Sequence, residues 1–210
     1  MLLDEKLYDY CDRNSNKLPF YLEQLENETG LIAVNPFMSC GPVLGRLLIQ
    51  ISHWIKPEQI LEIGSFTGYS ALCLAQGLKP GGKITCIEIN EEYKSIINKY
   101  FALSGRTEQL NLIIGDALEE VNKLNGPFDL AWIDANKQNN AQLYELIFPL
   151  IRPGGTIMVD NMLWYGNVLE TSPDKETRAI VEFNQRIKND PRISMFLLPV
   201  RDGLAILQKK

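Results

Sequence analysis

Three oxygen-bearing side chains follow two strongly apolar stretches of the sequence. Asp134 ends the stretch FDLAWIDA, and Asp160 with Asn161 ends GTIMVDN. If the two stretches form neighbouring parallel strands, about 4.8 Å apart, these side chains can converge on one ion. Two carboxylates and one amide make a hard oxygen set that suits Mg²⁺, and Mn²⁺ or Ca²⁺ could also occupy it. The alternative is that each aspartate only caps the helix that follows.

Lys137 lies three residues after Asp134, in the stretch DANKQN. A lysine at the surface is normally a solvated charge. Beside a dication, however, the ammonium form is disfavoured, and the neutral amine could accept a proton near neutral pH. The sequence therefore leaves two interpretations of Lys137 open, a general base and a surface charge.

A glycine turn lies upstream of these residues, in the stretch LEIGSFTGYS. Gly64 and Gly68 would let a ligand approach the backbone closely, but Ser65 and Phe66 crowd the place that a pyrophosphate would need. The middle glycine of the dinucleotide fingerprint and the Walker pattern are both missing. A phosphate-bearing ligand is therefore disfavoured, and a turn that serves only helix–strand packing remains an alternative.

Acidic residues accompany this turn at the ends of successive predicted strands. Glu62 enters the turn, Glu88 ends TCIEIN and Asp116 ends IIGDA. An acid at the end of the second strand of such a fold accepts hydrogen bonds from a ribose diol. Three carboxylates without a phosphate site suit a ligand that has an ammonium group, a diol and an adenine amine. S-adenosylmethionine has these groups, and we predict that it is the cofactor.

The elements that would position these residues alternate along the chain from about residue 59. The runs QILEIGS, KITCIEI, NLIIGDA, FDLAWIDA and GTIMVDN each precede a helical pattern, which indicates a parallel sheet with helices on both faces. The stretches KPGGK, NGPFD and RPGGT are expected to end helices and to begin the next strand. ISMFLLPV and GLAILQKK, separated by Arg201 and Asp202 ahead of Gly203, predict a tight hairpin that adds an antiparallel strand at the edge of the sheet.

The first 57 residues have helical patterns without a convincing strand, and residues 41–56 are the most regular of them. We expect this segment to cover the sheet or to form a lid over a Rossmann-like core of residues 58–210. No internal repeat or low-complexity linker marks a second domain. A length of 210 residues with 45% apolar content suits one α/β domain, residues 1–210.

Composition excludes several classes of partner. The formal net charge is −5 and no run of lysine or arginine occurs, so we expect no nucleic-acid partner. The amino terminus lacks the apolar core of a signal peptide, and no eighteen apolar residues run together, so we expect a cytoplasmic protein without a membrane partner. The four cysteines form no metal or redox motif and are interpreted as free thiols, and the single histidine, His53, as structural.

Several of these stretches together resemble one protein family. LEIGSFTGYSALCLAQGL, CIEIN, GDA, WIDANKQN, VDNMLWYGNV and PRISMFLLPVRDGLAILQKK are similar, in this order, to motifs of the cation-dependent O-methyltransferases. That group contains the catechol and caffeoyl-CoA O-methyltransferases. The similarity covers nearly all of residues 36–210, and residues 1–35 match only loosely. It implies a class I methyltransferase fold, methyl transfer from S-adenosylmethionine to a vicinal dihydroxy aromatic, and a homodimer.

The resemblance also implies roles for individual residues. Asp134, Asp160 and Asn161 would be the metal ligands, and Lys137 the catalytic base. Trp164 would lie against the aromatic substrate, together with Met38 and Lys137, although such apolar residues more often belong to a core. The expected cofactor-binding residues are Met38, Ser39, Glu62, Gly64, Phe66, Thr67, Ser70, Glu88, Ile89, Asp116, Ala117 and Asp134.

The implied reaction follows from charge. A phenol with a pKa of about 10 is mostly protonated at neutral pH. Coordination of two adjacent oxygens would stabilise the phenolate and aim one oxygen at the sulfonium methyl group, while Lys137 accepts the proton. The chain departs from the family's commoner DADKDN at Asn136 and Gln138, which removes charge near the metal. Arg201 stands where the family more often has glycine, and it could favour an anionic substrate.

Two other functions remain open on the sequence alone. A nicotinamide-dependent oxidoreductase on the same fold would need GxGxxG and would leave Asp134, Asp160 and Asn161 without a role. A protein that binds the cofactor without catalysis would need a decayed site, and the intact ligand positions and Lys137 argue against decay. The sequence does not identify the aromatic acceptor.

Overall fold

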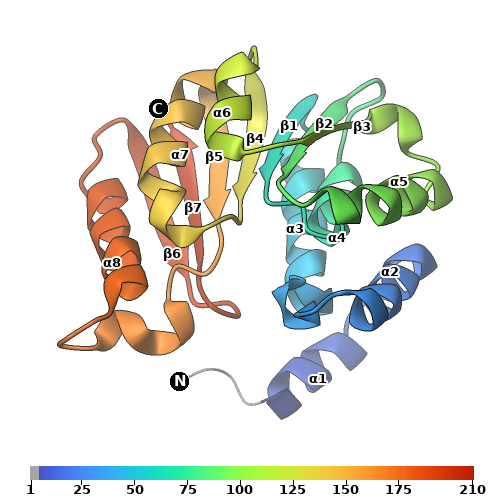
Figure 1. The fold of residues 1–210 in the computed structure, drawn as a ribbon, viewed down its shortest axis with the longest axis horizontal. Coiled ribbons are helices and arrows are strands. Elements are labelled where there is room, and N and C mark those ends of the chain that lie inside the picture. Colours follow the sequence, from blue (N-terminus) through green and yellow to red (C-terminus); the bar gives the residue numbers. More distant parts are fainter. Residues whose placement is uncertain (1–4) are drawn as a thin grey trace.

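The computed structural model describes residues 5–210, so expectations that fall on residues 1–4 lie outside the described part. Seven strands form one sheet in the order β3-β2-β1-β4-β5-β7-β6 (Figure 1). The strands are β1 (Gln59–Ile63), β2 (Lys83–Glu88), β3 (Leu110–Ile114), β4 (Phe128–Ile133), β5 (Ile151–Val159), β6 (Ile193–Leu198) and β7 (Leu204–Lys209). Strands β1 to β5 pair in parallel, and β7 pairs antiparallel with β5 and β6. The expected doubly wound, mostly parallel sheet is confirmed.

Helices precede the sheet and connect its strands. The α-helices are α1 (Glu5–Arg13), α2 (Phe20–Ile32), α3 (Gly41–Ile55), α4 (Tyr69–Ala75), α5 (Lys94–Leu103), α6 (Ala117–Glu120), α7 (Asn140–Ile147) and α8 (Lys175–Lys188). The 3₁₀ helices are η1 (Pro36–Met38), η2 (Glu91–Tyr93), η3 (Thr107–Gln109), η4 (Val121–Lys123), η5 (Lys137–Asn139), η6 (Phe148–Leu150) and η7 (Trp164–Leu169). Residues 5–57 contain helices and no strand, as predicted. Across residues 5–210, no helix has both the length and the apolar character needed to cross a bilayer.

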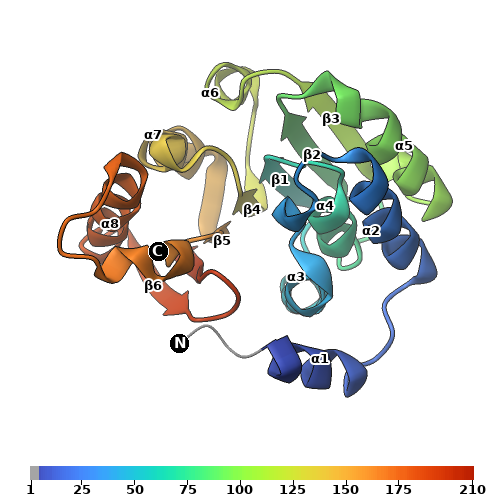
Figure 2. The same cartoon turned by 60° about the horizontal axis from the view of Figure 1, so that its bottom comes forward.

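The helices cover both faces of the sheet (Figures 1 and 2). One apolar core joins α2, α3, α4 and α5 to one face, and a second core joins α7 and α8 to the other. Along β4, Leu130 and Trp132 belong to the first core, whereas Ala131 and Ile133 belong to the second. Side chains alternate between the faces of a strand, so a strand buried on both faces has an unbroken apolar sequence.

The carboxyl-terminal hairpin lies at the edge of the sheet, as expected, and two details go beyond the expectation. Its last strand pair is Leu198 with Leu204, so residues 199–203 form the loop, which is longer than the expected tight turn. The antiparallel strand β7 lies inside the sheet, between β5 and β6, and β6 forms the edge. Because β6 runs in the same direction as β5, the loop lies at the edge of the sheet where the parallel strands end.

One glycine–proline stretch also lies elsewhere than expected. KPGGK and NGPFD precede β2 and β4, but RPGGT lies within β5. The register between β4 and β5 shifts there, from Phe128 opposite Ile151 to Leu130 opposite Thr156. The stretch forms an irregularity in the strand, and such bulges accommodate glycine.

The strand order reverses between β1 and β4, and ligands of such sheets bind outside the carboxyl ends of the strands at this point. Gly64 follows β1, and Asp134 follows β4. A Cβ atom on Gly64 would lie 2.0 Å from the backbone oxygen of Asp134, and the φ angle of Gly64 is +83°. Only glycine fits this close approach without displacement of the chain.

Candidate active site

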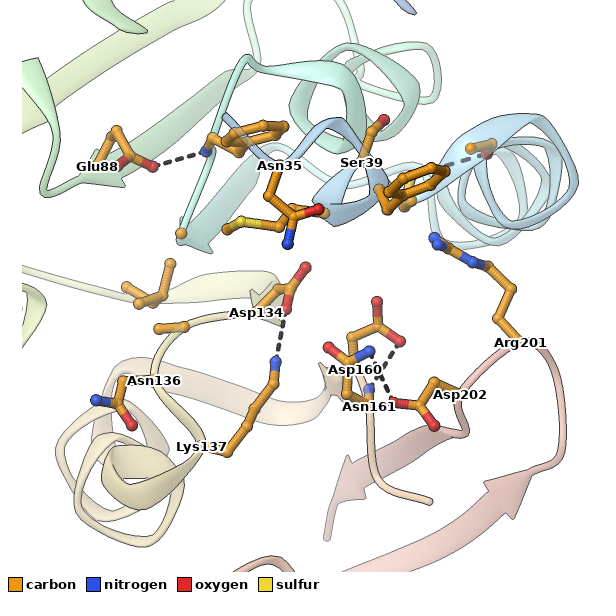
Figure 3. Close-up of a pocket in the computed structure, with 18 of the residues that line it drawn as sticks. Asn35, Ser39, Glu88, Asp134, Asn136, Lys137, Asp160, Asn161, Arg201 and Asp202 are labelled. Atoms are coloured by element: carbon orange, nitrogen blue, oxygen red, sulfur yellow. Dashed lines mark hydrogen bonds and ion pairs between the residues drawn. The ribbon is translucent and has the colours of Figure 1, made fainter. Parts of the chain in front are cut away.

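A large pocket lies at the carboxyl edge of the sheet, over the point where the strand order reverses (Figure 3). Its cavity volume is about 1340 Å³. Sites for one small ligand usually measure about 300–1,000 Å³. The pocket therefore has room for two small ligands side by side, as a transfer reaction requires.

The predicted metal ligands and base lie together in this pocket, because they follow the neighbouring strands β4 and β5. Lys137 Nζ donates to Asp134 Oδ1 at 2.6 Å, and the Lys137 side chain is only 10% exposed. Asp160 is buried, and its Oδ1 accepts from the backbone N–H of Asn161 at 2.8 Å. Neither aspartate caps a helix, and Lys137 is not a solvated surface charge.

The two carboxylates affect each other. Burial raises the pKa of Asp160, and the neighbouring Asp134 carboxylate raises it further, whereas Lys137 and Arg201 lower it. Two acids that repel each other in a buried place are unfavourable unless a positive charge joins them. Within the chain, Lys137 supplies that charge through its ion pair with Asp134.

The donor atoms fit a hard divalent cation. Across residues 5–210, no group of three or more His, Cys, Asp and Glu side chains could hold a metal ion, so the candidate set depends on two acids and one amide. Asn161 Nδ2 donates to Asp202 Oδ2 at 3.1 Å. Since an ionised carboxylate only accepts hydrogen bonds, this contact fixes the amide with its nitrogen on Asp202 and leaves the oxygen available to a cation.

The turn that carries Lys137 has a cap of its own. Asn136 Oδ1 accepts from the backbone N–H of Gln138 at 3.0 Å and caps η5. An aspartate could cap the turn in the same way. The departure from the family pattern at position 136 therefore removes a charge and retains the cap, which sequence analysis did not anticipate.

Glu88 joins the glycine turn to the end of β2. Its Oε2 accepts from the backbone N–H of Phe66 at 2.6 Å, and its Oε1 from that of Asn90 at 2.9 Å. The ring of Phe66 packs edge-on against Tyr93, with centroids 4.8 Å apart. Burial raises the pKa of Glu88. These contacts fix the turn and the acid as one wall of the pocket.

Most of the predicted cofactor-binding residues line the pocket, namely Met38, Ser39, Gly64, Phe66, Glu88, Ile89, Asp116, Ala117 and Asp134. Ser70 lines a small adjoining cavity instead, together with Ser39 and Gly64. Thr67 and Glu62 are fully buried, and Thr67 Oγ1 accepts a hydrogen bond from Thr29 at 2.9 Å. Neither residue is among those that line the pocket, so their roles stay predictions.

Glu62 is nevertheless an unusual buried acid. Within the described residues, both of its carboxylate oxygens are buried without a hydrogen-bond partner. Burial raises its pKa to about 7, and Ser65, Ser70 and Cys86 lie close enough to lower it, although none of them meets the geometry of a hydrogen bond. A buried carboxylate without a hydrogen bond is costly, and this one lies two residues before Gly64.

Aromatic residues form another part of the wall. Trp164 and Tyr165 line the pocket with ring centroids 5.7 Å apart. Their φ angles are +47° and +55°, in a region that bulky residues enter at a cost. The backbone N–H of Tyr165 donates to Asp202, which helps to hold this conformation. Trp164 was predicted for the substrate side, and sequence analysis gave no role to Tyr165 or Asp202.

The amino-terminal helices also border the pocket. Tyr8, Asp9 and Asp12 of α1 and Glu26 of α2 line it. The segment was expected to cover the sheet or to form a lid, and these four residues place parts of α1 and α2 at the wall of the pocket. No pattern in the sequence indicated these four residues, because their place depends on how α1 packs against the rest of the chain.

Comparison with known proteins gives consistent results. A family model described as O-methyltransferase matches residues 12–210. Catechol O-methyltransferase domain-containing protein 1 of Mus musculus is 34% identical over 170 residues, which are 78% of this chain and 65% of that protein. Caffeoyl-CoA O-methyltransferase 1 of Eucalyptus globulus is 32% identical over 224 residues, which are 100% of this chain and 90% of that protein. The chain thus spans about two thirds of the mouse relative and most of the plant one.

Solved structures share the fold over almost the whole chain. A methyltransferase of Podospora anserina bound to S-adenosylhomocysteine has a TM-score of 0.91 and 27% identity, and the match covers 98% of this chain and 94% of that one. An O-methyltransferase of Bacillus cereus in complex with S-adenosylhomocysteine has a TM-score of 0.89 and 29% identity, with 96% of each chain covered. These matches confirm the resemblance seen in the motifs. The chain belongs to the family of S-adenosylmethionine-dependent O-methyltransferases that contains the catechol and caffeoyl-CoA O-methyltransferases.

Proposed function

We propose that the protein transfers the methyl group of S-adenosylmethionine to one hydroxyl of a vicinal dihydroxy aromatic, with a divalent metal ion held by Asp134, Asp160 and Asn161. The observation that carries this proposal is the convergence of these three oxygen donors with Lys137, whose Nζ lies 2.6 Å from Asp134 Oδ1, in one pocket. The names of the catechol-type and caffeoyl-type relatives support the acceptor class.

The glycine turn and its neighbouring acids would hold the cofactor, which supplies a methyl group activated by a sulfonium. Glu88 offers a buried carboxylate to the ribose diol. Gly64 lets the cofactor approach the backbone, because it carries no Cβ. Glu62, a fully buried acid two residues before Gly64, would compensate the ammonium group.

Asp134, Asp160 and Asn161 would bind the metal with three hard oxygens and leave open positions for the acceptor. A divalent cation bound there would supply positive charge that favours ionisation of an acceptor hydroxyl. Asp202 holds the Asn161 amide in the required orientation through its contact at 3.1 Å. Magnesium is the first choice for this donor set, and manganese is an alternative.

Lys137 would accept the proton of the reacting hydroxyl at Nζ. Its side chain is almost buried, lies on a capped turn and is held by Asp134, so the amine has a fixed position. Trp164, Tyr165 and Met38 provide apolar surface for the aromatic ring on the pocket wall. The pocket would then position the cofactor and the acceptor, and removal of the hydroxyl proton would allow the methyl group to be transferred.

A panel of dihydroxy aromatics with labelled S-adenosylmethionine, assayed with and without Mg²⁺, tests the proposal. We expect methylation of vicinal dihydroxy compounds, its loss in excess chelator, and its recovery with Mg²⁺ or Mn²⁺. Full activity with metal content verified as negligible would contradict the metal site. Equal rates with phenols that have one hydroxyl would contradict the acceptor class.

Two further expectations stay predictions. The resemblance implies a homodimer, which light scattering coupled to gel filtration would test. The cytoplasmic location would be tested by fractionation of the cells that produce the protein.

A further inference from the structure

Arg201 lines the pocket, and neither the cofactor nor the metal proposal uses it. Its backbone N–H donates to Tyr8 Oη at 2.9 Å, but its guanidinium has no hydrogen bond or ion pair within residues 5–210. The other cation of the pocket, Lys137, is paired with Asp134. Figure 3 shows the Arg201 side chain extending from the loop of residues 199–203 into the pocket. Arg201 is half-buried, and the five N–H donors of its guanidinium have no acceptor within the described residues.

The loop beneath this side chain is held from two sides. Tyr8 binds the backbone of Arg201, and Asp202 accepts from both Asn161 and the backbone of Tyr165. The φ angle of Arg201 is +48°, a conformation that residues with a Cβ adopt only when their surroundings impose it. The base of the side chain is thus fixed, which reduces the freedom that it would lose when it binds a ligand.

The negative charge of the acids in the pocket does not explain why the N–H donors of Arg201 have no acceptor. Arg201 lowers the pKa values of Asp160, Asp202 and Glu26, in each case against burial, which raises them. None of these acids makes an ion pair with the guanidinium, and Asp12 already pairs with Arg46 at 2.6 Å. The field of Arg201 acts on its neighbours, but its directional hydrogen bonds remain unused.

The carboxylate of the cofactor is the first acceptor to consider, and the geometry disfavours it. The small cavity beside the glycine turn, where Ser39, Gly64 and Ser70 meet, is the place proposed for the amino acid end of the cofactor, and Arg201 is not among its lining residues. Arg201 instead shares its loop with Asp202, which contacts the proposed metal ligand Asn161. The guanidinium thus belongs to the acceptor side of the pocket.

We propose that Arg201 binds a carboxylate on the aromatic acceptor and so selects acidic dihydroxy aromatics over neutral ones. The inference rests on the proposed function, because it concerns the acceptor of the same reaction. A planar guanidinium matches a carboxylate with two parallel hydrogen bonds, and such charged contacts are the strong ones. The metal triad would hold the two hydroxyls, and Arg201 would hold the acid.

The test compares 3,4-dihydroxybenzoate with its methyl ester, which differs only in charge and one methyl group. We would measure the wild type, Arg201→Gly and Arg201→Lys in two ways. Methylation rates are followed with labelled cofactor, and binding of each compound is followed by calorimetry in the presence of S-adenosylhomocysteine and Mg²⁺. We expect the wild type to prefer the acid by about 10- to 100-fold, the scale of a charged hydrogen bond. Arg201→Gly should remove this preference through a higher KM for the acid, and glycine tolerates the positive φ angle.

Arg201→Lys should keep part of the preference, since it retains the charge and loses the planar pair of donors. Arg186→Gln is the matched control, because Arg186 of α8 pairs with Glu145 of α7 outside the pocket. This variant should leave the rates and affinities with both compounds unchanged. Circular dichroism of each variant verifies the fold.

Three results would overturn the inference: an equal loss for acid and ester, an unchanged preference in Arg201→Gly, or a weakened affinity for S-adenosylhomocysteine, which would assign the guanidinium to the cofactor. If neither compound is methylated, the proposed function fails on these acceptors, and calorimetry still decides on Arg201 by comparing acid and ester. Absence of any binding by the acid would also overturn it.

Discussion

Acids at the carboxyl edge of the sheet differ from acids at the amino edge in their pKa values. Around the pocket, burial raises the pKa values of Asp160 and Asp202. At the amino edge, where β6 begins, hydrogen bonds from Arg192 lower the pKa values of Glu145 and Asp190. The first group accepts hydrogen bonds but makes no ion pair within the described residues, whereas the second is paired with arginine.

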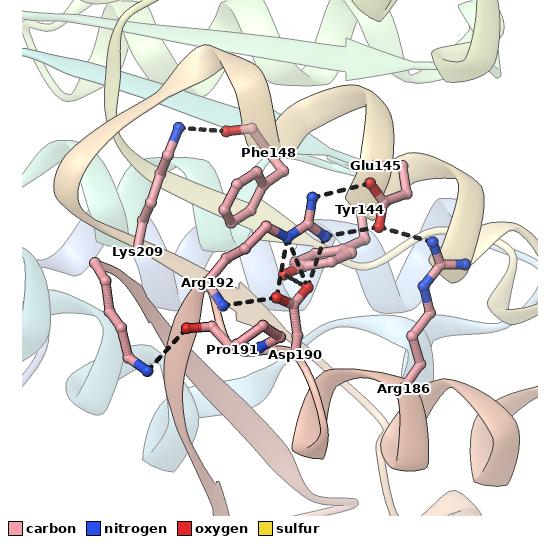
Figure 4. Close-up of polar contacts among 9 residues, drawn as sticks. Tyr144, Glu145, Phe148, Arg186, Asp190, Pro191, Arg192 and Lys209 are labelled. Atoms are coloured by element: carbon pink, nitrogen blue, oxygen red, sulfur yellow. Dashed lines mark hydrogen bonds and ion pairs between the residues drawn. The ribbon is translucent and has the colours of Figure 1, made fainter.

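The contacts at the amino edge show how complete this pairing is (Figure 4). Arg192 Nη2 donates to Asp190 Oδ2 at 2.6 Å and to Glu145 Oε1 at 2.8 Å. Tyr144 Oη donates to Asp190 Oδ2 at 2.9 Å, and Arg186 donates to Glu145 at 2.7 Å. This network ties α7, α8 and the start of β6 together, and none of these residues lines the pocket.

The difference indicates a division of work within one fold. Buried acids without an ion pair weaken the ligand-free protein but leave acceptor atoms for ligands. Paired acids strengthen the opposite edge, where no ligand is expected. Substitutions at the two edges should therefore affect different measured quantities, and the predictions below test this in order of decreasing effect.

The largest effect is expected for Lys137→Ala at the carboxyl edge. Loss of a positioned base should lower the rate of methyl transfer by about 10² to 10⁴. Lys137→Arg should not restore it, since a guanidinium keeps its proton at any working pH. Single-turnover rates on a catechol at neutral pH measure the effect, and affinity for S-adenosylhomocysteine is the control. Near-normal rates in both variants would show that Lys137 serves only to pair Asp134.

Much of this architecture could be predicted from sequence because it depends on local patterns. Strands buried on both faces have continuous apolar runs, and the residues directly after them lie at one edge of the sheet. For that reason Asp134 and Asp160 were predicted to converge, and Glu88 was predicted at the same edge of the sheet. All three line one pocket. The Gly64 turn was also predicted from its two glycines, and the structure adds that Gly64 closely approaches the backbone of Asp134.

The remainder depends on contacts between distant segments, which no local pattern encodes. Asp202 orients Asn161 across 41 positions of sequence, and Tyr8 reaches Arg201 across 193. The edge hairpin was predicted, but the sequence did not say that β7 is its inner strand, because a hairpin pattern does not specify which of its two strands joins the sheet. The Arg192 network was missed because exposed charges in sequence do not indicate their partners.

Asp190→Asn tests the amino edge. The variant loses the charged acceptor of Arg192 and Tyr144, so its free energy of unfolding should fall by about 1 to 2 kcal/mol. The lower end of the range for charged hydrogen bonds applies because Arg192 is 43% exposed and water screens the pair. Urea denaturation measures the change, and methyl transfer at 25 °C should be unaffected. A tenfold loss of activity at equal stability would contradict the division between the edges.

The pH dependence of stability should show both groups of acids in the metal-free protein. At the carboxyl edge, Glu62 has a raised pKa of about 7 when folded and Asp160 also has a raised pKa, so their destabilising effect should disappear as the pH falls from about 7 towards 4.5. Asp190 and Glu145 have lowered pKa values when folded, so their stabilisation is present above about pH 4 and is lost below it. Urea denaturation between pH 8 and 3 should therefore give a maximum near pH 5, with a change of about 1 kcal/mol on each side. A steady decline from pH 8 would contradict the contribution of the buried acids. An acid limb unchanged in Asp190→Asn would contradict that of Asp190.

The smallest effect on stability is expected for Asp160→Asn, and its sign makes it informative. Asparagine has nearly the shape of aspartate, and its amide oxygen can still accept from the backbone N–H of Asn161, a contact of 2.8 Å. The substitution removes a buried charge that Asp134 repels, so the free energy of unfolding should rise by about 0.5 to 1.5 kcal/mol in excess chelator at neutral pH, because a repelled buried charge destabilises the fold. Methyl transfer should fall at the same time, since one proposed metal ligand is weakened. The same chemical change would then stabilise the protein at one edge of the sheet and destabilise it at the other, at position 190. A loss of stability as large as that of Asp190→Asn would mean that Asp160 is satisfied within the chain, and the contrast between the edges would no longer support a metal site.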